Sequence, residues 1–309
     1  MNPGNNNMDL AVELAGLKLE NPVLLASGTA GYGTELLSVT DISGVGGIVL
    51  KSVTVEPRAG NPWPRTWETT GGMLNSIGLE NVGIDALVED VIPRLEGLGC
   101  AVIASIVGET VLEFARLASR LDGSGAVSAL EVNVSCPNVE RGGIQFGADE
   151  GTTYAVVKAV RDNTSLPVFV KLSAAVTDMA PMAEASKMGG ASGLSVINTM
   201  PGLAVDPVSR RPRLASVTGG LSGPAIKPIA LKAVWDCYRA TDLPIIGGGG
   251  IYDADDVVEF IIAGATAVAV GTVTFQYPGK SLEIIDSLPA ALARAGAESP
   301  RQLVGTLRV

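Results

Sequence analysis

The sequence predicts one α/β domain in which eight parallel strands and their helices close into a (β/α)8 barrel, the TIM-barrel fold. Short β-branched apolar runs recur about every 25–35 residues, and amphipathic helical patterns separate them. The runs are continuously apolar, which is typical of parallel strands covered on both faces. Eight such units in 309 residues match a closed barrel better than an open sheet.

The predicted strands are residues 23–26, 47–51, 101–106, 129–135, 168–173, 193–198, 244–247 and 267–271. Before them, residues 10–20 have the pattern of a small hairpin that would close the barrel floor. A doubly wound dinucleotide-binding sheet is the alternative fold, but Gly28, Gly31 and Gly33 have the wrong spacing for its glycine turn. We expect a polar tail at residues 1–8 and a single barrel domain over residues 9–309.

Two predicted connections, residues 52–81 and 199–222, are too long to be simple turns between a strand and a helix. Both follow the carboxyl end of a strand, which is the end of a barrel where active sites form. A third connection, residues 136–149, is rich in glycine and polar residues, and we expect it to act as a mobile lid.

The composition excludes several classes of function. A formal net charge of −10 without a basic stripe argues against nucleic-acid binding. The chain has no histidine, which excludes Ser-His-Asp hydrolysis and histidine bases or metal ligands. Its three cysteines form no CxxC pair, so we expect no metal or iron–sulfur site on this chain. Without a signal peptide or a long apolar span, we expect a soluble cytoplasmic protein.

Polar side chains gather at the carboxyl ends of the predicted strands, where parallel strands would bring them around one cavity. They are Lys51, Asn133, Ser135, Lys171, Asn198 and Thr199. A single lysine at such a position is as readily a solvated rim residue as a ligand contact. Two lysines in a chain with only 17% charged residues favour an anionic ligand.

Glycine-rich turns follow the last two predicted strands. Residues 247–250 are four consecutive glycines, and Gly271-Thr272 ends the eighth strand. Helices are expected near Asp253 and Lys280, and turns of this kind commonly hold a phosphate with backbone N–H groups. The glycines could serve only tight turns, but four in a row exceed what a turn needs. A phosphate here and a planar group near Lys171 would suit flavin mononucleotide (FMN).

Cys136, within Asn133-Val134-Ser135-Cys136-Pro137-Asn138, is the candidate catalytic base. A lone cysteine is more often a packed apolar residue, which we expect of Cys100 and Cys237. Cys136 instead begins a polar loop, and in a chain without histidine a thiolate is an available base. The amides of residues 71–81 suit a planar ligand with imide and carboxylate groups.

Together these motifs resemble the class 1 dihydroorotate dehydrogenases along nearly the whole chain. The resemblance is densest in residues 21–29, 75–81, 133–138, 198–199 and 219–225 and in the two glycine turns. Residues 139–147 and 209–212 indicate the 1B branch of that family.

The resemblance implies a role for each matching position, with Cys136 as the base. Substrate contacts would be Lys51, Asn75, Ser76, Ile77, Gly78, Leu79, Asn133, Asn198 and Thr199. FMN contacts would be Ser27, Lys51, Ser52, Ser105, Asn133, Lys171, Ile197, Gly223, Gly249, Gly250, Gly271 and Thr272. Three departures from the family pattern would alter flavin affinity or redox tuning: Ser105 in place of Asn, Ala174-Ala175 in place of Pro-Asn, and Gly248 in place of a larger residue.

The implied activity is oxidation of dihydroorotate to orotate in pyrimidine synthesis. In the 1B branch, a homodimer of barrels joins two partner subunits that carry FAD and a [2Fe-2S] cluster, and this heterotetramer passes electrons to NAD. One alternative is another FMN-dependent pyrimidine reductase, related to dihydropyrimidine dehydrogenase. A second is a Schiff-base aldolase or sugar-phosphate isomerase with Lys51 or Lys171 as nucleophile.

Overall fold

The structure is a computed structural model that describes residues 8–135 and 149–309. Within these residues, eight parallel strands close into a barrel in the order β10-β15-β16-β3-β4-β7-β8-β9. The strands are β3 (Val23–Leu25), β4 (Gly47–Val49), β7 (Ala101–Ile106), β8 (Val127–Asn133), β9 (Val168–Leu172), β10 (Gly193–Val196), β15 (Ile245–Gly248) and β16 (Ala267–Val270). Every predicted strand is present, with ends shifted by a residue or two, and the predicted barrel is confirmed.

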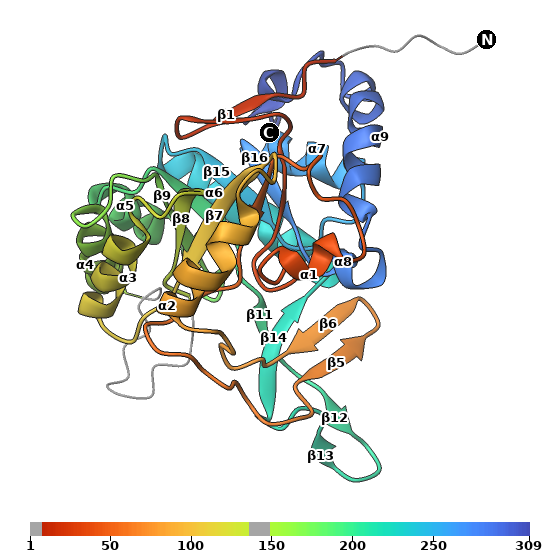
Figure 1. Cartoon of the computed structure of the whole chain (residues 1–309). Helices are drawn as coiled ribbons and strands as arrows, with labels where there is room; N and C mark the ends of the chain where they lie inside the picture. Colours follow the sequence, from red (N-terminus) through yellow and green to blue (C-terminus); the bar gives the residue numbers. More distant parts are fainter. Residues whose placement is uncertain (1–7, 136–148) are drawn as a thin grey trace.

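Helices follow the barrel strands and cover the outside of the barrel (Figure 1). They are α1 (Thr34–Leu37), α2 (Ile84–Ala86) with the turns Leu87–Val91 and Ile92–Leu95, α3 (Val111–Leu121), α4 (Glu150–Arg161), α5 (Ala180–Met188), α6 (Lys227–Ala240) after the turn Pro224–Ile226, α7 (Ala254–Ala263), α8 (Val273–Gln276) and α9 (Lys280–Arg294), with the turn Pro300–Leu303 near the end. In the described ranges, no helix combines the length and apolarity needed to cross a bilayer.

Helix α3 illustrates how the sequence specifies these helices. The Thr110 hydroxyl accepts a hydrogen bond from the backbone N–H of Glu113 and so caps the first turn. Phe114, Leu117 and Leu121 recur at intervals of three and four residues and are all fully buried. The cap and the apolar stripe together fix where the helix starts and which side faces the barrel.

The interior of the barrel changes character along its axis. Side chains alternate along a strand, so Ala129, Glu131 and Asn133 of β8 share one face. Ala129 belongs to an apolar layer with Leu24, Val49, Ile103, Phe169, Ile246 and Ala267. Two residues after the members of this layer, the inward-facing side chains are polar. Glu131 follows Ala129 in this way, and Lys171 follows Phe169. The barrel is therefore apolar at the amino ends of its strands and polar at the carboxyl ends.

The predicted floor hairpin is formed by β1 (Val12–Leu14) and β2 (Leu17–Leu19), which pair antiparallel. Val12, Leu14 and Leu19 are buried against the apolar layer of the barrel, so the hairpin closes the floor as predicted. Of the predicted tail, residues 1–7 lie outside the described residues, and Met8 is partly buried against the core.

The two long connections form a sheet of their own, where the sequence predicted only loops. Strands β5 (Thr66–Thr69) and β6 (Gly72–Asn75) come from the first connection, and β11 (Met200–Leu203) and β14 (Thr218–Ser222) come from the second. They pair antiparallel in the order β11-β14-β6-β5, with a small hairpin of β12 (Val205–Asp206) and β13 (Arg211–Pro212) beyond them. Figure 1 shows this four-stranded sheet at the end of the barrel opposite β1.

Replacing Leu14 with alanine should lower the free energy of unfolding by about 2–5 kcal/mol, because it leaves a cavity under the barrel floor. Urea unfolding followed by circular dichroism measures this loss. Glu13→Ala, an exposed position on the same strand, is the matched control and should change stability by less than about 0.5 kcal/mol. Similar losses in the two variants would contradict the packing of the hairpin against the barrel.

Candidate active site

A cavity of about 1260 Å³ lies at the carboxyl ends of the barrel strands and extends to the four-stranded sheet. Ligand pockets usually hold about 300–1000 Å³, so this one has room for two ligands side by side. All the residues that the sequence singled out as substrate or flavin contacts line it, apart from Ser105. Cys136 and the expected lid lie outside the described residues.

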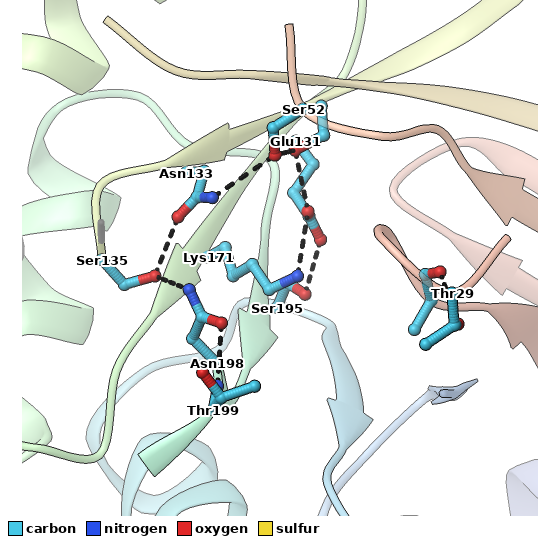
Figure 2. A network of polar contacts seen from close by, with 11 residues as sticks. Thr29, Ser52, Glu131, Asn133, Ser135, Lys171, Ser195, Asn198 and Thr199 are labelled. Atoms are coloured by element: carbon cyan, nitrogen blue, oxygen red, sulfur yellow. Dashed lines mark hydrogen bonds and ion pairs between the residues drawn. The ribbon is translucent and has the colours of Figure 1, made fainter. Parts of the chain in front are cut away.

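The inner wall of the cavity is organised around Glu131, which is only 2% exposed. Its carboxylate accepts hydrogen bonds from the Ser105 hydroxyl (3.1 Å) and the Ser195 hydroxyl (2.9 Å). The Lys171 ammonium lies 3.3 Å from the same carboxylate and forms an ion pair with it. Figure 2 shows Lys171 and Ser195 converging on Glu131. The four residues come from the neighbouring strands β7, β8, β9 and β10. A buried charge is tolerated when it is paired and hydrogen-bonded in this way.

The hydrogen bonds leading to Glu131 run in one direction. The Ser105 hydroxyl gives its only proton to Glu131, so in its 2.8 Å bond with Ser52 it must be the acceptor. Ser52 in turn accepts from the Asn133 amide at 3.4 Å, and the Asn133 carbonyl oxygen accepts from Ser135 at 2.9 Å. The Asn198 amide donates to Ser135 at 2.6 Å (Figure 2). The chain thereby fixes which way both amides are turned.

The cavity wall beside residues 75–80 carries two cations, Lys51 and Arg65, and two carboxylates, Glu68 and Glu80. Glu80 contacts Arg65 at 2.6 Å and Lys51 at 3.7 Å. Glu80 thus holds both cations at this wall, where their donors can contact an anionic ligand in the cavity.

The loop of residues 75–79 is held in place by its own neighbours. The Asn75 amide donates to the Gly220 carbonyl oxygen of β14 at 3.3 Å. The backbone N–H of Asn61 donates to Ile77, and that of Ser76 donates to Arg65. The loop is therefore preorganised rather than free to move, as a binding surface for a planar ligand requires.

The predicted phosphate turns meet a third segment, residues 222–223. Thr272 donates to the Ser222 hydroxyl at 2.8 Å. Gly250 has a φ of 91°, and a Cβ there would lie 3.0 Å from the Gly223 carbonyl oxygen. Only glycine permits this close approach, which leaves backbone without side chains facing the cavity. Such backbone is suited to a phosphate.

Helix α7 begins where predicted, but its amino end is already satisfied by acidic side chains. Asp253 caps the helix, and the Asp256 carboxylate accepts the backbone N–H groups of Tyr252 (2.7 Å) and Asp253 (3.1 Å). Two carboxylates at this position would repel a phosphate, so the turns themselves are the better phosphate site.

Lys227, at the start of α6, is bound to Asp256 at 2.5 Å and to Glu259 at 2.8 Å. Burial lowers the pKa of the Lys227 ammonium. The hydrogen bonds to Asp256 and Glu259 raise this pKa by more than burial lowers it, so the net shift is upward. The ion pair with Asp256 ties the turn after β15 to the start of α6.

Ser105 does not line the cavity, although the resemblance implied a flavin contact for it. It is 1% exposed and reaches the cavity wall only through its bonds to Ser52 and Glu131. Among the other departures, Ala175 and Gly248 line the cavity, whereas Ala174 packs against the core.

Sequence reasoning missed Glu131 and Ser195, which sit inside apolar strands and line the cavity. A signal was present, because a charged residue inside the predicted strand 129–135 needs a partner when the strand is buried. Asn133 lies two residues further along and was already a candidate, so Glu131 faces the same way.

The two described cysteines have the packed character expected of them. Burial raises the pKa of the Cys100 thiol to about 11. Burial, followed by the charges of Asp236 and Asp178, raises that of Cys237 to about 12.

Comparisons with known proteins agree with one another. The sequence profile of the family described as "Dihydroorotate dehydrogenase" matches residues 9–292. The chain is 52% identical over 295 residues to the "Dihydroorotate dehydrogenase B (NAD(+)), catalytic subunit" of Desulforudis audaxviator, covering 96% of each chain. It is 52% identical over 301 residues to the protein of the same name from Geobacter sulfurreducens, covering 97% of this chain and 99% of the relative.

Among solved structures, the chain is similar to the crystal structure of DHODH from Eimeria tenella in complex with ferulenol. The TM-score is 0.81 at 25% sequence identity, and the match covers 96% of this chain and 88% of the other.

Iodoacetamide at pH 8 should modify the native chain at Cys136 and leave Cys100 and Cys237 unlabelled. With a pKa of about 11, only about one Cys100 thiol in a thousand is ionised at that pH. Peptide mapping by mass spectrometry identifies the labelled site, and labelling in urea provides the control in which all three thiols react. Rapid labelling of Cys100 in the native protein would contradict the assignment.

Proposed function

Because the chain belongs to the dihydroorotate dehydrogenase family, we propose that it is a B-type catalytic subunit that binds FMN and oxidises dihydroorotate to orotate. Family membership makes the chain an oxidoreductase and confirms the resemblance drawn from its motifs, including the 1B branch. The observation that carries the proposal is a single cavity lined by amides, by cations and by the glycine turns after β15 and β16, with the Glu131–Lys171 pair in its wall.

The residues present fit FMN, which when bound supplies the hydride acceptor. Its phosphate would be held by backbone groups of Gly223, Gly249, Gly250, Gly271 and Thr272, which line the cavity. A Cβ at Gly250 would collide with Lys227 and the Gly223 carbonyl oxygen and so push these turns apart. Its ring would be held by Ser27, Lys51, Ser52, Asn133, Lys171 and Ile197, which line the cavity. Ser105 acts on this set through Ser52 and Glu131.

The substrate would be bound by the opposite part of the cavity. Asn75, Asn133 and Asn198 would bind the imide and carboxylate of dihydroorotate, together with residues 76–79 and Thr199. Lys51 would offset the negative charge of the substrate. Cys136 would take the C5 proton on its Sγ, and the enclosing walls would exclude water from the site.

We also propose that the barrels form a homodimer, which joins two partner subunits carrying FAD and a [2Fe-2S] cluster. These subunits would lead electrons to NAD. Two observations support the partner subunits and the cluster they would carry. The relatives are named as an NAD(+)-linked catalytic subunit, and the sequence has too few cysteines for a cluster of its own.

The purified chain should be yellow, release FMN on denaturation and oxidise dihydroorotate with an artificial acceptor. Dihydrouracil serves as the competing substrate, because it lacks the carboxylate that Lys51 and the amides would bind. Release of flavin is read by absorbance and mass, and oxidation by orotate absorbance. A colourless protein, or a preference for dihydrouracil, would reject the proposal.

Cys136→Ala should lower kcat for dihydroorotate oxidation by about 10²–10⁴-fold, because it removes the proposed base. FMN content and orotate binding, measured by absorbance titration, should stay near wild type. Cys100→Ala is the matched control, since Cys100 precedes the amino end of β7 and lies beside β2, whereas the cavity lies at the carboxyl ends of the strands. Near-normal turnover of Cys136→Ala would remove Cys136 from this role.

A further inference from the structure

Glu131 is a buried acid in the cavity wall that the proposed reaction does not use. Strand register brings it beside Lys171, because β8 and β9 pair in parallel with Asn133 opposite Lys171. Strand β10 pairs in parallel with the other edge of β9, and there Ser195 lies opposite Lys171. The Lys171 side chain is 13% exposed and that of Glu131 2%, so the pair lies at the boundary between the polar layer and the cavity.

We infer that Glu131 is a positioning residue that holds the Lys171 ammonium against the bound flavin and offsets its charge, an inference that rests on the proposed function. A lysine has a long flexible side chain, and fixing its ammonium requires a partner that is itself fixed. Glu131 meets this requirement, because Ser105 and Ser195 donate to its two oxygens and leave one direction for Lys171.

The charge of the pair has a consequence for the flavin. Reduction adds negative charge to the ring, and a nearby unpaired ammonium would stabilise that charge and raise the midpoint potential. Glu131 brings the sum of the two charges close to zero while leaving the ammonium in place as a hydrogen-bond donor. Lys171 can therefore still orient the flavin by donating a hydrogen bond, while Glu131 offsets most of the effect of its positive charge on the flavin.

Glu131→Gln tests this inference in the FMN-loaded chain, because the variant keeps the shape of the side chain and removes its charge. The midpoint potential of bound FMN, measured by spectroelectrochemistry, should rise. The Kd for FMN, measured by flavin fluorescence on titration of the apoprotein, should increase on the order of tenfold, because the neutral amide still accepts from the Lys171 ammonium but holds it less firmly than the carboxylate does. Val160→Ala, fully buried in α4 and away from the cavity, is the control for lost stability alone.

An unchanged potential in Glu131→Gln, or an equal shift in Val160→Ala, would overturn the inference. If Glu131→Gln does not retain FMN, Glu131→Asp replaces it, since it keeps the charge but withdraws it from Lys171. That variant should bind FMN more weakly than Val160→Ala does, and equal affinity would overturn the inference. Absence of FMN or of dihydroorotate oxidation in the wild-type chain would instead reject the proposed function.

Discussion

Glu131 places a carboxylate inside the barrel, where its loss of hydration has to be offset by neighbouring donors. The donors come from three other strands, through Ser105, Lys171 and Ser195. Each must point inward at the same height along the barrel axis, and strand register sets that height. A shift of one residue in any of these pairings would turn a donor outward and leave the buried carboxylate without one of its hydrogen bonds or, for Lys171, without its counter-charge.

The same carboxylate organises groups that it does not touch. Ser52 and Asn133 are oriented by the hydrogen-bond chain that ends on Glu131, and Asn198 is connected to that chain through Ser135. An amide can be turned either way in a symmetric polar pocket, but here one orientation satisfies all the bonds. The polar layer thus presents a defined pattern of donors and acceptors to a ligand, resting on an apolar layer that holds the strands rigidly.

The barrel and most of the cavity lining could be predicted from the sequence because their signals are local. Continuous apolar runs identified the strands, and the polar residues at their ends had to meet at one rim. The residues behind that rim could not be assigned in the same way. The hydrogen bond from Ser105 to Glu131 joins residues of two different strands that lie 26 positions apart in the sequence, a contact that no local pattern reports.

The four-stranded sheet escaped prediction for a different reason. Its strands are short, and Thr66–Thr69 is largely exposed, so no apolar run marks it. The pairing joins Leu74 to Leu221, residues separated by almost half of the chain, and local patterns do not report such a contact. The second acidic residue at the start of α7 was also not predicted. Asp253 indicated where the helix begins, but the Asp256 carboxylate accepts backbone N–H groups there only because the turn before the helix folds back toward it.

The pairing of β6 with β14 also limits how this protein can vary in length. Because Asn75 lies opposite Gly220 in an antiparallel register, inserting one residue into either strand would move Asn75 to the other face of the sheet. Insertions and deletions in the two connections are therefore not independent, although they are far apart in the gene. The hairpin of β12 and β13, which pairs only with itself, is the part of the second connection where length can change freely.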